Sequence, residues 1–90
     1  MIKLWGKCIK NHNITKQKTY AVNVDTIDWS YFYGYIAELA RAMEEPTPIL
    51  LKAHIFDFAK FNFVKFVPSD FVESVDFDQM VVELIKDEIK

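Results

Sequence analysis

Three polar residues near the middle of the chain could form a site for proton transfer. His54 and Asp57 are three positions apart, so on a helical turn they would share a face, with Lys52 close by. A histidine beside a carboxylate can act as a general acid or base or bind a metal, but either role needs further partners within reach. The spacing alone does not supply them, so a structural or capping histidine is the favoured interpretation.

Neither the single cysteine nor the acidic run near the end predicts a reactive or metal-binding site. Cys8 lies among apolar residues, which favours a packed thiol over a nucleophile and excludes a disulfide within one chain. The acidic run lacks the glycine and the terminal glutamate of a calcium loop; its members are Asp70, Glu73, Asp76 and Asp78. We therefore expect no catalytic residue, no metal and no cofactor.

The N-terminal segment is rich in lysine and could contact nucleic acid. Residues 1–24 contain no acid and five lysines, which are Lys3, Lys7, Lys10, Lys16 and Lys18. With Trp5 as a stacking surface, they predict weak, salt-dependent nucleic-acid binding as the alternative function. The formal net charge is −2, however, so we expect no whole-molecule attraction to nucleic acid or to an anionic membrane. The acids of residues 66–90 are expected to attract these lysines weakly across a sheet.

Aromatic residues make up 16% of the chain, which is more than one small core readily hides. Some should lie at the surface, where aromatic side chains favour protein interfaces. The predicted interface comprises Trp5, Tyr31, Tyr35, Phe71 and Phe77. The leading interpretation is a non-enzymatic module that forms a homodimer or binds another protein, with nucleic acid the less favoured partner and no membrane contact.

One helix is predicted between Ile27 or Asp28 and Glu45. Apolar residues recur there at three- and four-residue spacing and would form one stripe, made of Trp29, Phe32, Tyr33, Ile36, Leu39, Ala40 and Met43. Roughly 17 residues would cross a four-stranded sheet. Gly34 opposes helix propensity, which indicates a close approach to a strand or to a bulky aromatic.

A hairpin is predicted before this helix and a short helix after it. Residues 2–10 alternate imperfectly, so both faces of this strand are expected to be partly covered, whereas residues 14–24 alternate as a half-buried strand does. The Asn11-His12-Asn13 triplet between them suits a tight turn. Residues 54–61 suit two helical turns that would bring Ile55, Phe58 and Ala59 together.

Two further strands complete the predicted fold. Residues 63–67 alternate up to Pro68, and residues 80–85 fit a strand, although the apolar spacing of residues 80–89 also suits a helix. Residues 86–90 are expected to form a frayed tail. The resulting fold class is α+β, with an antiparallel sheet of about four strands and one long amphipathic helix on one face.

Composition is consistent with one ordered domain spanning residues 1–90. The chain is 51% hydrophobic and contains only two glycines and three prolines, which argues against disorder. No apolar run is long enough to span a bilayer, and the N-terminus lacks the pattern of a secretory signal. We therefore expect a cytoplasmic protein.

Two motifs stand near the ends of the chain, Leu4-Trp5-Gly6-Lys7 and the run DFVESVDFD over residues 70–78. The residues that accompany them are Pro48, Leu51, Lys52, His54, Phe58, Phe61 and Phe66. Together they resemble a set of small, uncharacterised bacterial proteins of about this length. The resemblance covers nearly the whole chain and implies a stand-alone domain, but it implies no activity and transfers no catalytic residue.

Overall fold

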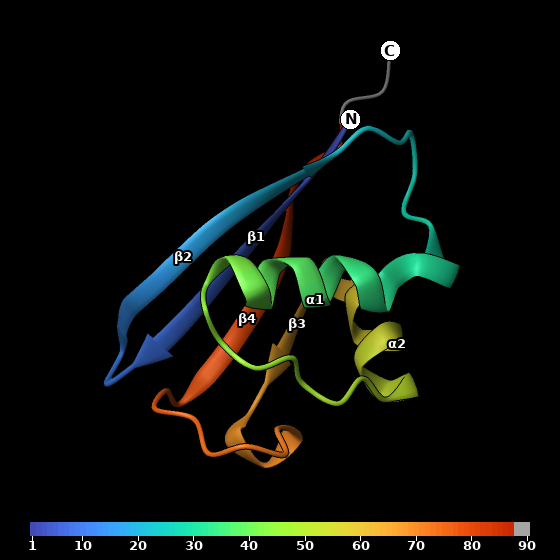
Figure 1. Cartoon of the computed structure of the whole chain (residues 1–90). Coiled ribbons are helices and arrows are strands. Elements are labelled where there is room, and N and C mark those ends of the chain that lie inside the picture. The colour runs from blue at the N-terminus through green and yellow to red at the C-terminus, as the bar shows by residue number, and fades with distance from the viewer. Residues whose placement is uncertain (88–90) are drawn as a thin grey trace.

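A computed structural model of the chain, which describes residues 1–87, contains a four-stranded antiparallel sheet and two α-helices (Figure 1). The strands are β1 (Ile2–Lys10), β2 (Asn13–Val22), β3 (Phe63–Phe66) and β4 (Gln79–Asp87), in the order β2-β1-β4-β3. The predicted α+β class and antiparallel sheet are confirmed. The sequence of residues 80–89 suited either a strand or a helix, and the structure has the strand β4 there, up to Asp87. The predicted frayed tail is wrong for residues 86 and 87, which pair with β1, and residues 88–90 lie outside the described residues.

The hairpin of β1 and β2 closes on a tight turn. Asn11 and His12 have φ angles of 52° and 67°, the left-handed pair that two-residue hairpin loops require. The side-chain amide nitrogen Nδ2 of Asn13 donates a hydrogen bond to the backbone carbonyl of Asn11 at 3.2 Å. The turn is therefore the one expected from the asparagines.

The first helical segment is shorter than predicted and begins differently. A 3₁₀ turn, η1 (Trp29–Tyr31), precedes α1 (Phe32–Ala42), and the Asp28 carboxylate accepts hydrogen bonds from the amide and hydroxyl of Ser30 at 3.1 and 2.6 Å. Residues before Phe32 therefore turn by more than 100° each and leave the α-helical stripe. Trp29 and Tyr33, predicted in the core, are 44% and 54% exposed.

Glycines allow two close approaches around α1. A Cβ on Gly6 of β1 would lie 3.1 Å from Met43 Cε and 3.2 Å from Leu39 Cδ2, so the missing side chain lets the helix pack closely on the strand. A Cβ on Gly34 would lie 2.5 Å from the Tyr31 ring. The bulky aromatic expected beside Gly34 is thus Tyr31.

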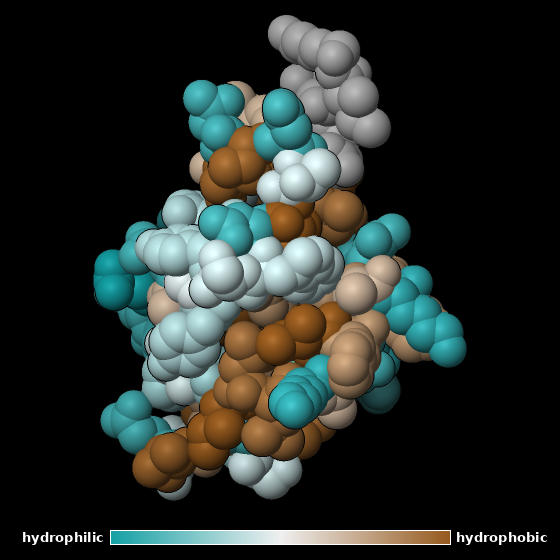
Figure 2. Space-filling model, turned by 90° about the vertical axis from the view of Figure 1, so that its right-hand side faces the viewer, coloured by the Kyte–Doolittle hydropathy of each residue, from teal (hydrophilic) through white to brown (hydrophobic). Residues whose placement is uncertain are grey.

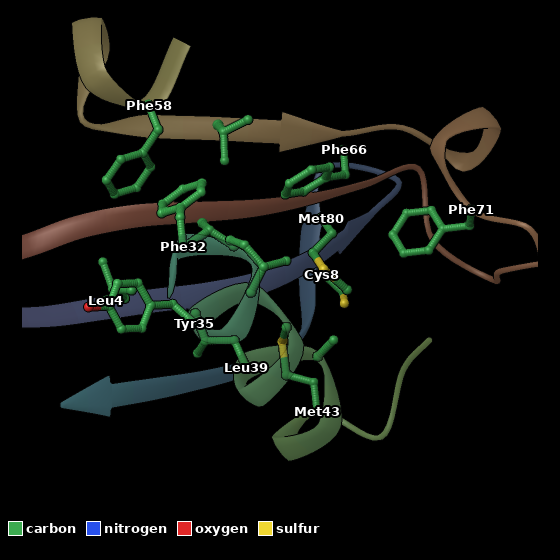
Figure 3. Close-up of a cluster of buried hydrophobic side chains, with 14 of the residues drawn as sticks. Leu4, Cys8, Phe32, Tyr35, Leu39, Met43, Phe58, Phe66, Phe71 and Met80 are labelled. Atoms are coloured by element: carbon green, nitrogen blue, oxygen red, sulfur yellow. The ribbon is translucent and has the colours of Figure 1, made fainter. Parts of the chain in front are cut away.

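The core lies between the two helices and one face of the sheet (Figure 3). α2 (Lys52–Phe61) packs on β3, which follows after the left-handed residue Asn62 at φ 63°. The Phe58 ring of α2 meets the Phe32 ring of α1 at a centroid distance of 4.9 Å. Beyond η2 (Pro68–Asp70), Phe71 and Phe77 contact each other at 5.3 Å and join this core.

Candidate functional site

His54 holds the start of α2 in place. Its Nδ1 accepts a hydrogen bond from the Leu51 amide at 2.9 Å, which satisfies one of the free N–H groups at a helix N-terminus. The other ring nitrogen, Nε2, lies 3.5 Å from Asp70 Oδ2, and the ring packs on Phe66 at 4.6 Å. The histidine is 8% exposed. This is the capping role that the sequence favoured, with both nitrogens occupied.

The predicted pairing of His54 with Asp57 does not form. Asp57 is exposed and instead lines a shallow pocket of about 200 Å³ with Phe61, Phe63 and Lys65 beside the edge strand β3. Lys52 is exposed at the first position of α2. The three polar candidates therefore do not converge on a common site.

The remaining candidates for chemistry are also structural. Cys8 is fully buried on the helix-covered side of β1, and burial raises the pKa of its thiol to about 11, so the reactive thiolate is disfavoured. Among residues 1–87, no group of three His, Cys, Asp or Glu side chains is placed to hold a metal ion.

The predicted aromatic interface is wrong for three of its five residues. Tyr35, Phe71 and Phe77 are only 2%, 7% and 4% exposed, because the α1 stripe turns Tyr35 toward β2 and the 67–78 segment folds its phenylalanines inward. Tyr31 is 52% exposed and Trp5 is half-buried. Helical periodicity by itself places Tyr35 with the core, three residues after Phe32 and four before Leu39, so the prediction that it is exposed misjudged the position of the stripe.

A different apolar surface lies on the side of the molecule where α2 is found. We call it the α2 surface and define it as Trp29, Ile49, Leu51, Ile55 and Phe56. The Trp29 ring meets Phe58 of α2 at 6.2 Å, which links the start of the first helical segment to α2. Figure 2 shows that apolar side chains dominate the lower half of this side.

Four of the five side chains of the α2 surface are largely exposed. Phe56 is 69% exposed, Leu51 53%, Ile49 47% and Trp29 44%. The predicted interface omitted Ile49 and Leu51 because it contained aromatic residues alone, and it omitted Phe56 of α2. The position of Phe56 outside the Ile55, Phe58 and Ala59 stripe was the available indication.

The opposite face of the sheet, which we call the open face, carries Lys3, Trp5, Lys7, Phe63, Lys65, Val81 and Glu83. The core contains the alternate residues of the same strands, including Leu4, Val64 and Val82, and both helices pack on that side. Within the described part of the chain, no helix crosses the open face, but at its β3 edge the Phe63 ring contacts the ring of Phe61, the last residue of α2, at a centroid distance of 6.2 Å. Exposure on this face is uneven: Phe63 is 37% exposed and the Glu83 side chain 41%, whereas Val81 is only 5% exposed and the Lys7 side chain 16%.

Strand register arranges the open face in rows. Trp5 pairs with Glu83, and Glu83 pairs with Phe63, so the two aromatics flank one carboxylate. In the next row Lys7 and Lys65 flank Val81. Two strand spacings separate the members of each flanking pair, or about 10 Å between backbones.

A polar network orients Trp5 on this face. The indole Nε1 donates to Gln17 Oε1 at 3.0 Å, and Lys7 Nζ lies 3.9 Å from the ring centroid. Lys7 Nζ also lies 3.6 Å from Glu83 Oε1, and the Lys7 side chain is only 16% exposed. The ring is thus fixed, and one of its faces is covered by the lysine.

The structure divides the five predicted nucleic-acid lysines. Lys10 pairs with Asp76 at 2.7 Å and Lys16 pairs with Glu45 at 2.8 Å. Lys16 and Lys18 pair with Cys8 and Gly6, so they lie on the helix side of the sheet. Only Lys3 and Lys7 share the open face with Trp5.

Lys65 and Phe63 join that face from β3 and were not predicted as contacts. Their strand lies next to β4 and two strands from β1, a long-range pairing that local alternation does not reveal.

Comparison with known proteins adds no family to this description. The part of the chain that the structure describes contains no helix long and apolar enough to cross a membrane. The sequence matches no protein-family model, no curated protein and no solved structure.

Proposed function

We propose that this chain is a non-enzymatic interaction module that self-associates through the α2 surface. The observation that carries the proposal is the grouping of exposed apolar side chains there, led by Phe56 at 69% and Leu51 at 53% exposure. Isolated exposed apolar residues are ordinary, whereas a group on one side of a small domain is typical of an interface.

The chemistry of the α2 surface resembles an interface core with a charged rim. Its defining residues are all uncharged, while Lys52 and Lys60 lie one helical turn before and after Phe56. In a symmetric dimer the apolar patches of two copies would meet, and these lysines would stay at the solvated edge. A second copy needs no complementary charge, so it fits this surface directly.

Sedimentation velocity over a concentration series tests the proposal. We expect the wild-type chain to shift from monomer to dimer with increasing concentration, and Leu51→Ser and Phe56→Ser each to weaken association at least about tenfold, as interface-centre residues do. Ile14→Ser is the matched control, because Ile14 is 45% exposed but lies on β2 outside the α2 surface.

The proposal is wrong if the wild-type chain remains monomeric at the highest concentration and captures no other protein through these residues. It is also wrong if Ile14→Ser weakens association as strongly as Phe56→Ser. Capture of a different protein that Phe56→Ser abolishes would keep the interaction module and replace the second copy as its partner.

A further inference from the structure

We propose that the open face of the sheet binds single-stranded nucleic acid, with bases stacked on Trp5 and Phe63 and phosphates held by Lys3 and Lys65. This function goes beyond the proposed self-association, and it uses the opposite side of the sheet from the helix layer. The two proposals therefore stand or fall separately.

Charge is distributed unevenly between the open face and the rest of the molecule. The defining residues of the open face include three lysines and one glutamate, whereas the whole chain has a net charge of −2. Lys7 lies against Glu83, so those two charges offset each other. Lys3 and Lys65 form no salt bridge with any described residue, which leaves two cations on this face for an anionic partner.

The aromatic side chains of the open face are placed for stacking. Trp5 and Phe63 lie in one row on either side of Glu83, and Phe63 is 37% exposed. The bond to Gln17 and the contact with Lys7 fix the indole, so little side-chain freedom is lost when a base stacks on it. Because Lys7 covers one face of the ring and no helix formed by residues 1–87 lies above it, a base would reach the other face.

A single-stranded nucleic acid fits this combination better than other anionic partners. Its bases have free flat faces for two aromatic rings, and its phosphates recur beside them for the lysines. A duplex hides its base faces, and an acidic peptide would use the lysines but not the rings. The open face is also less apolar than the α2 surface, because it places four charged side chains among its defining residues.

Two phosphate contacts predict weak binding with a small salt dependence. Each contact to a single strand contributes about −0.7 to the slope of log K against log salt concentration, so the expected slope is about −1.4. Affinity should then fall about sevenfold between 50 and 200 mM salt. The expected dissociation constant is on the order of 10⁻⁴ M at moderate salt.

Fluorescence anisotropy with labelled oligothymidylate and oligouridylate of about 12 nucleotides tests the phosphate contacts. Lys65→Gln should reduce the magnitude of the salt slope by about 0.7. Lys18→Gln is the matched control: it makes the same charge change on β2, but Lys18 pairs with Gly6 and lies on the other side of the sheet. It should leave the slope unchanged.

Tryptophan fluorescence tests the stacking directly. In a Trp29→Phe background Trp5 is the remaining tryptophan, and binding of the same oligonucleotides should quench it. A Trp5→Phe variant that retains Trp29 should show no quenching on binding. Trp5→Leu should weaken binding at least about fivefold, while Trp5→Phe should retain most of the affinity, because phenylalanine keeps a ring for stacking. Circular dichroism confirms that each variant is folded.

Three results would overturn the proposal. One is the absence of binding at about 20 mM salt, where electrostatic attraction is strongest. Another is an equal loss of slope in Lys18→Gln and Lys65→Gln. The last is binding of polyglutamate as tightly as of the oligonucleotides with no effect of Trp5→Leu. Binding of both DNA and RNA strands supports the proposal, and preference for one identifies the sugar that the face favours.

Discussion

The two faces of the sheet are built from neighbouring residues of the same strands, yet they differ completely in what holds them. On β1, Leu4 is 0% exposed in the apolar core, while the next residue, Trp5, lies on the open face between Gln17 and Lys7. The covered face is stabilised by removing apolar surface from water, whereas the open face is held by polar contacts that remain near solvent. Fold and surface chemistry are thus separated along a single strand.

This separation indicates which substitutions should disturb stability and which should disturb binding. The covered face has to match the helices, as the close approach of Leu39 and Met43 to Gly6 shows. The open face has no covering helix within residues 1–87, so its side chains can vary without repacking a layer. The two faces are therefore compared most directly by substituting adjacent residues, one on each face, and measuring the loss of stability that each substitution causes.

The largest expected effect is at Leu4. Leu4→Ala should lower the free energy of unfolding by about 2–5 kcal/mol, because it leaves a cavity between β1 and the helices. Trp5→Leu should lower the free energy of unfolding by about 1 kcal/mol, because it removes the cation–π contact with Lys7 and some apolar area. Urea denaturation of the two variants measures the difference. If both variants lost a similar free energy of unfolding, the open face would be covered in solution and the two faces would not differ in this way.

Cys8 provides a pH-dependent test of the covered face. Burial raises the pKa of its thiol from 9.0 to about 11 in the folded protein. The folded state therefore holds this proton more tightly than the unfolded state, so the contribution is complete below pH 9 and is lost as pH rises toward 11. The difference between these two pKa values corresponds to roughly 2–3 kcal/mol of folding stability.

The measurement is the free energy of unfolding of the wild type and of Cys8→Ala between pH 8 and about pH 11. The difference in free energy of unfolding between the wild type and Cys8→Ala should be constant below about pH 8.5. At higher pH the wild type should lose stability relative to the variant. A constant gap at every pH would show that water reaches the thiol and that this part of the face is less closed than the core around it.

Much of the fold follows from local pattern. The asparagine turn between residues 2–10 and 14–24 determines the hairpin, which was predicted. The predicted end of the first helix at Glu45 is three residues too late, because α1 ends at Ala42 and Glu44 has a left-handed φ of 59°.

The exposure of Tyr33 and the burial of Tyr35 were not predicted, because the predicted stripe was placed too far to one side: within α1, Tyr35 follows Phe32 by three residues and precedes Leu39 by four, which puts it on the buried face. Trp29 leaves that face for a different reason, the 3₁₀ turn at Trp29–Tyr31. A regular helical period cannot reveal such a turn.

The candidate surfaces were harder to predict than the fold. The five lysines of residues 1–24 looked like one group in the sequence, but strand alternation puts Lys3 and Lys7 on one face and Lys16 and Lys18 on the other. Lys65 joins the open face only because β3 pairs with β4. A site that depends on the order of strands is not encoded in any short segment, so it becomes visible only when the sheet is assembled.

The smallest expected effect concerns two charged residues that lie on neither the covered face nor the open face of the sheet. Lys10 and Asp76 form an ion pair 2.7 Å long at the exposed end of the hairpin, where the lysine-rich strand meets the acidic 71–78 segment. The hydrogen bond and the charge of Lys10 lower the pKa of the Asp76 carboxyl. The contribution of this pair to stability is present above the ordinary pKa of aspartate and is lost as pH falls through the lowered value.

Titration of Asp76 by NMR should show a pKa below that of an ordinary aspartate, and Lys10→Gln should return it toward the ordinary value. High salt should have the same effect on the wild type, because exposed charges are screened. Neither change should alter the urea midpoint measurably, since exposed pairs contribute little. If Lys10→Gln destabilised the chain as Leu4→Ala does, the ion pair would be part of the structural framework. At this end of the hairpin, exposed charges as well as the covered face would then determine the stability of the fold.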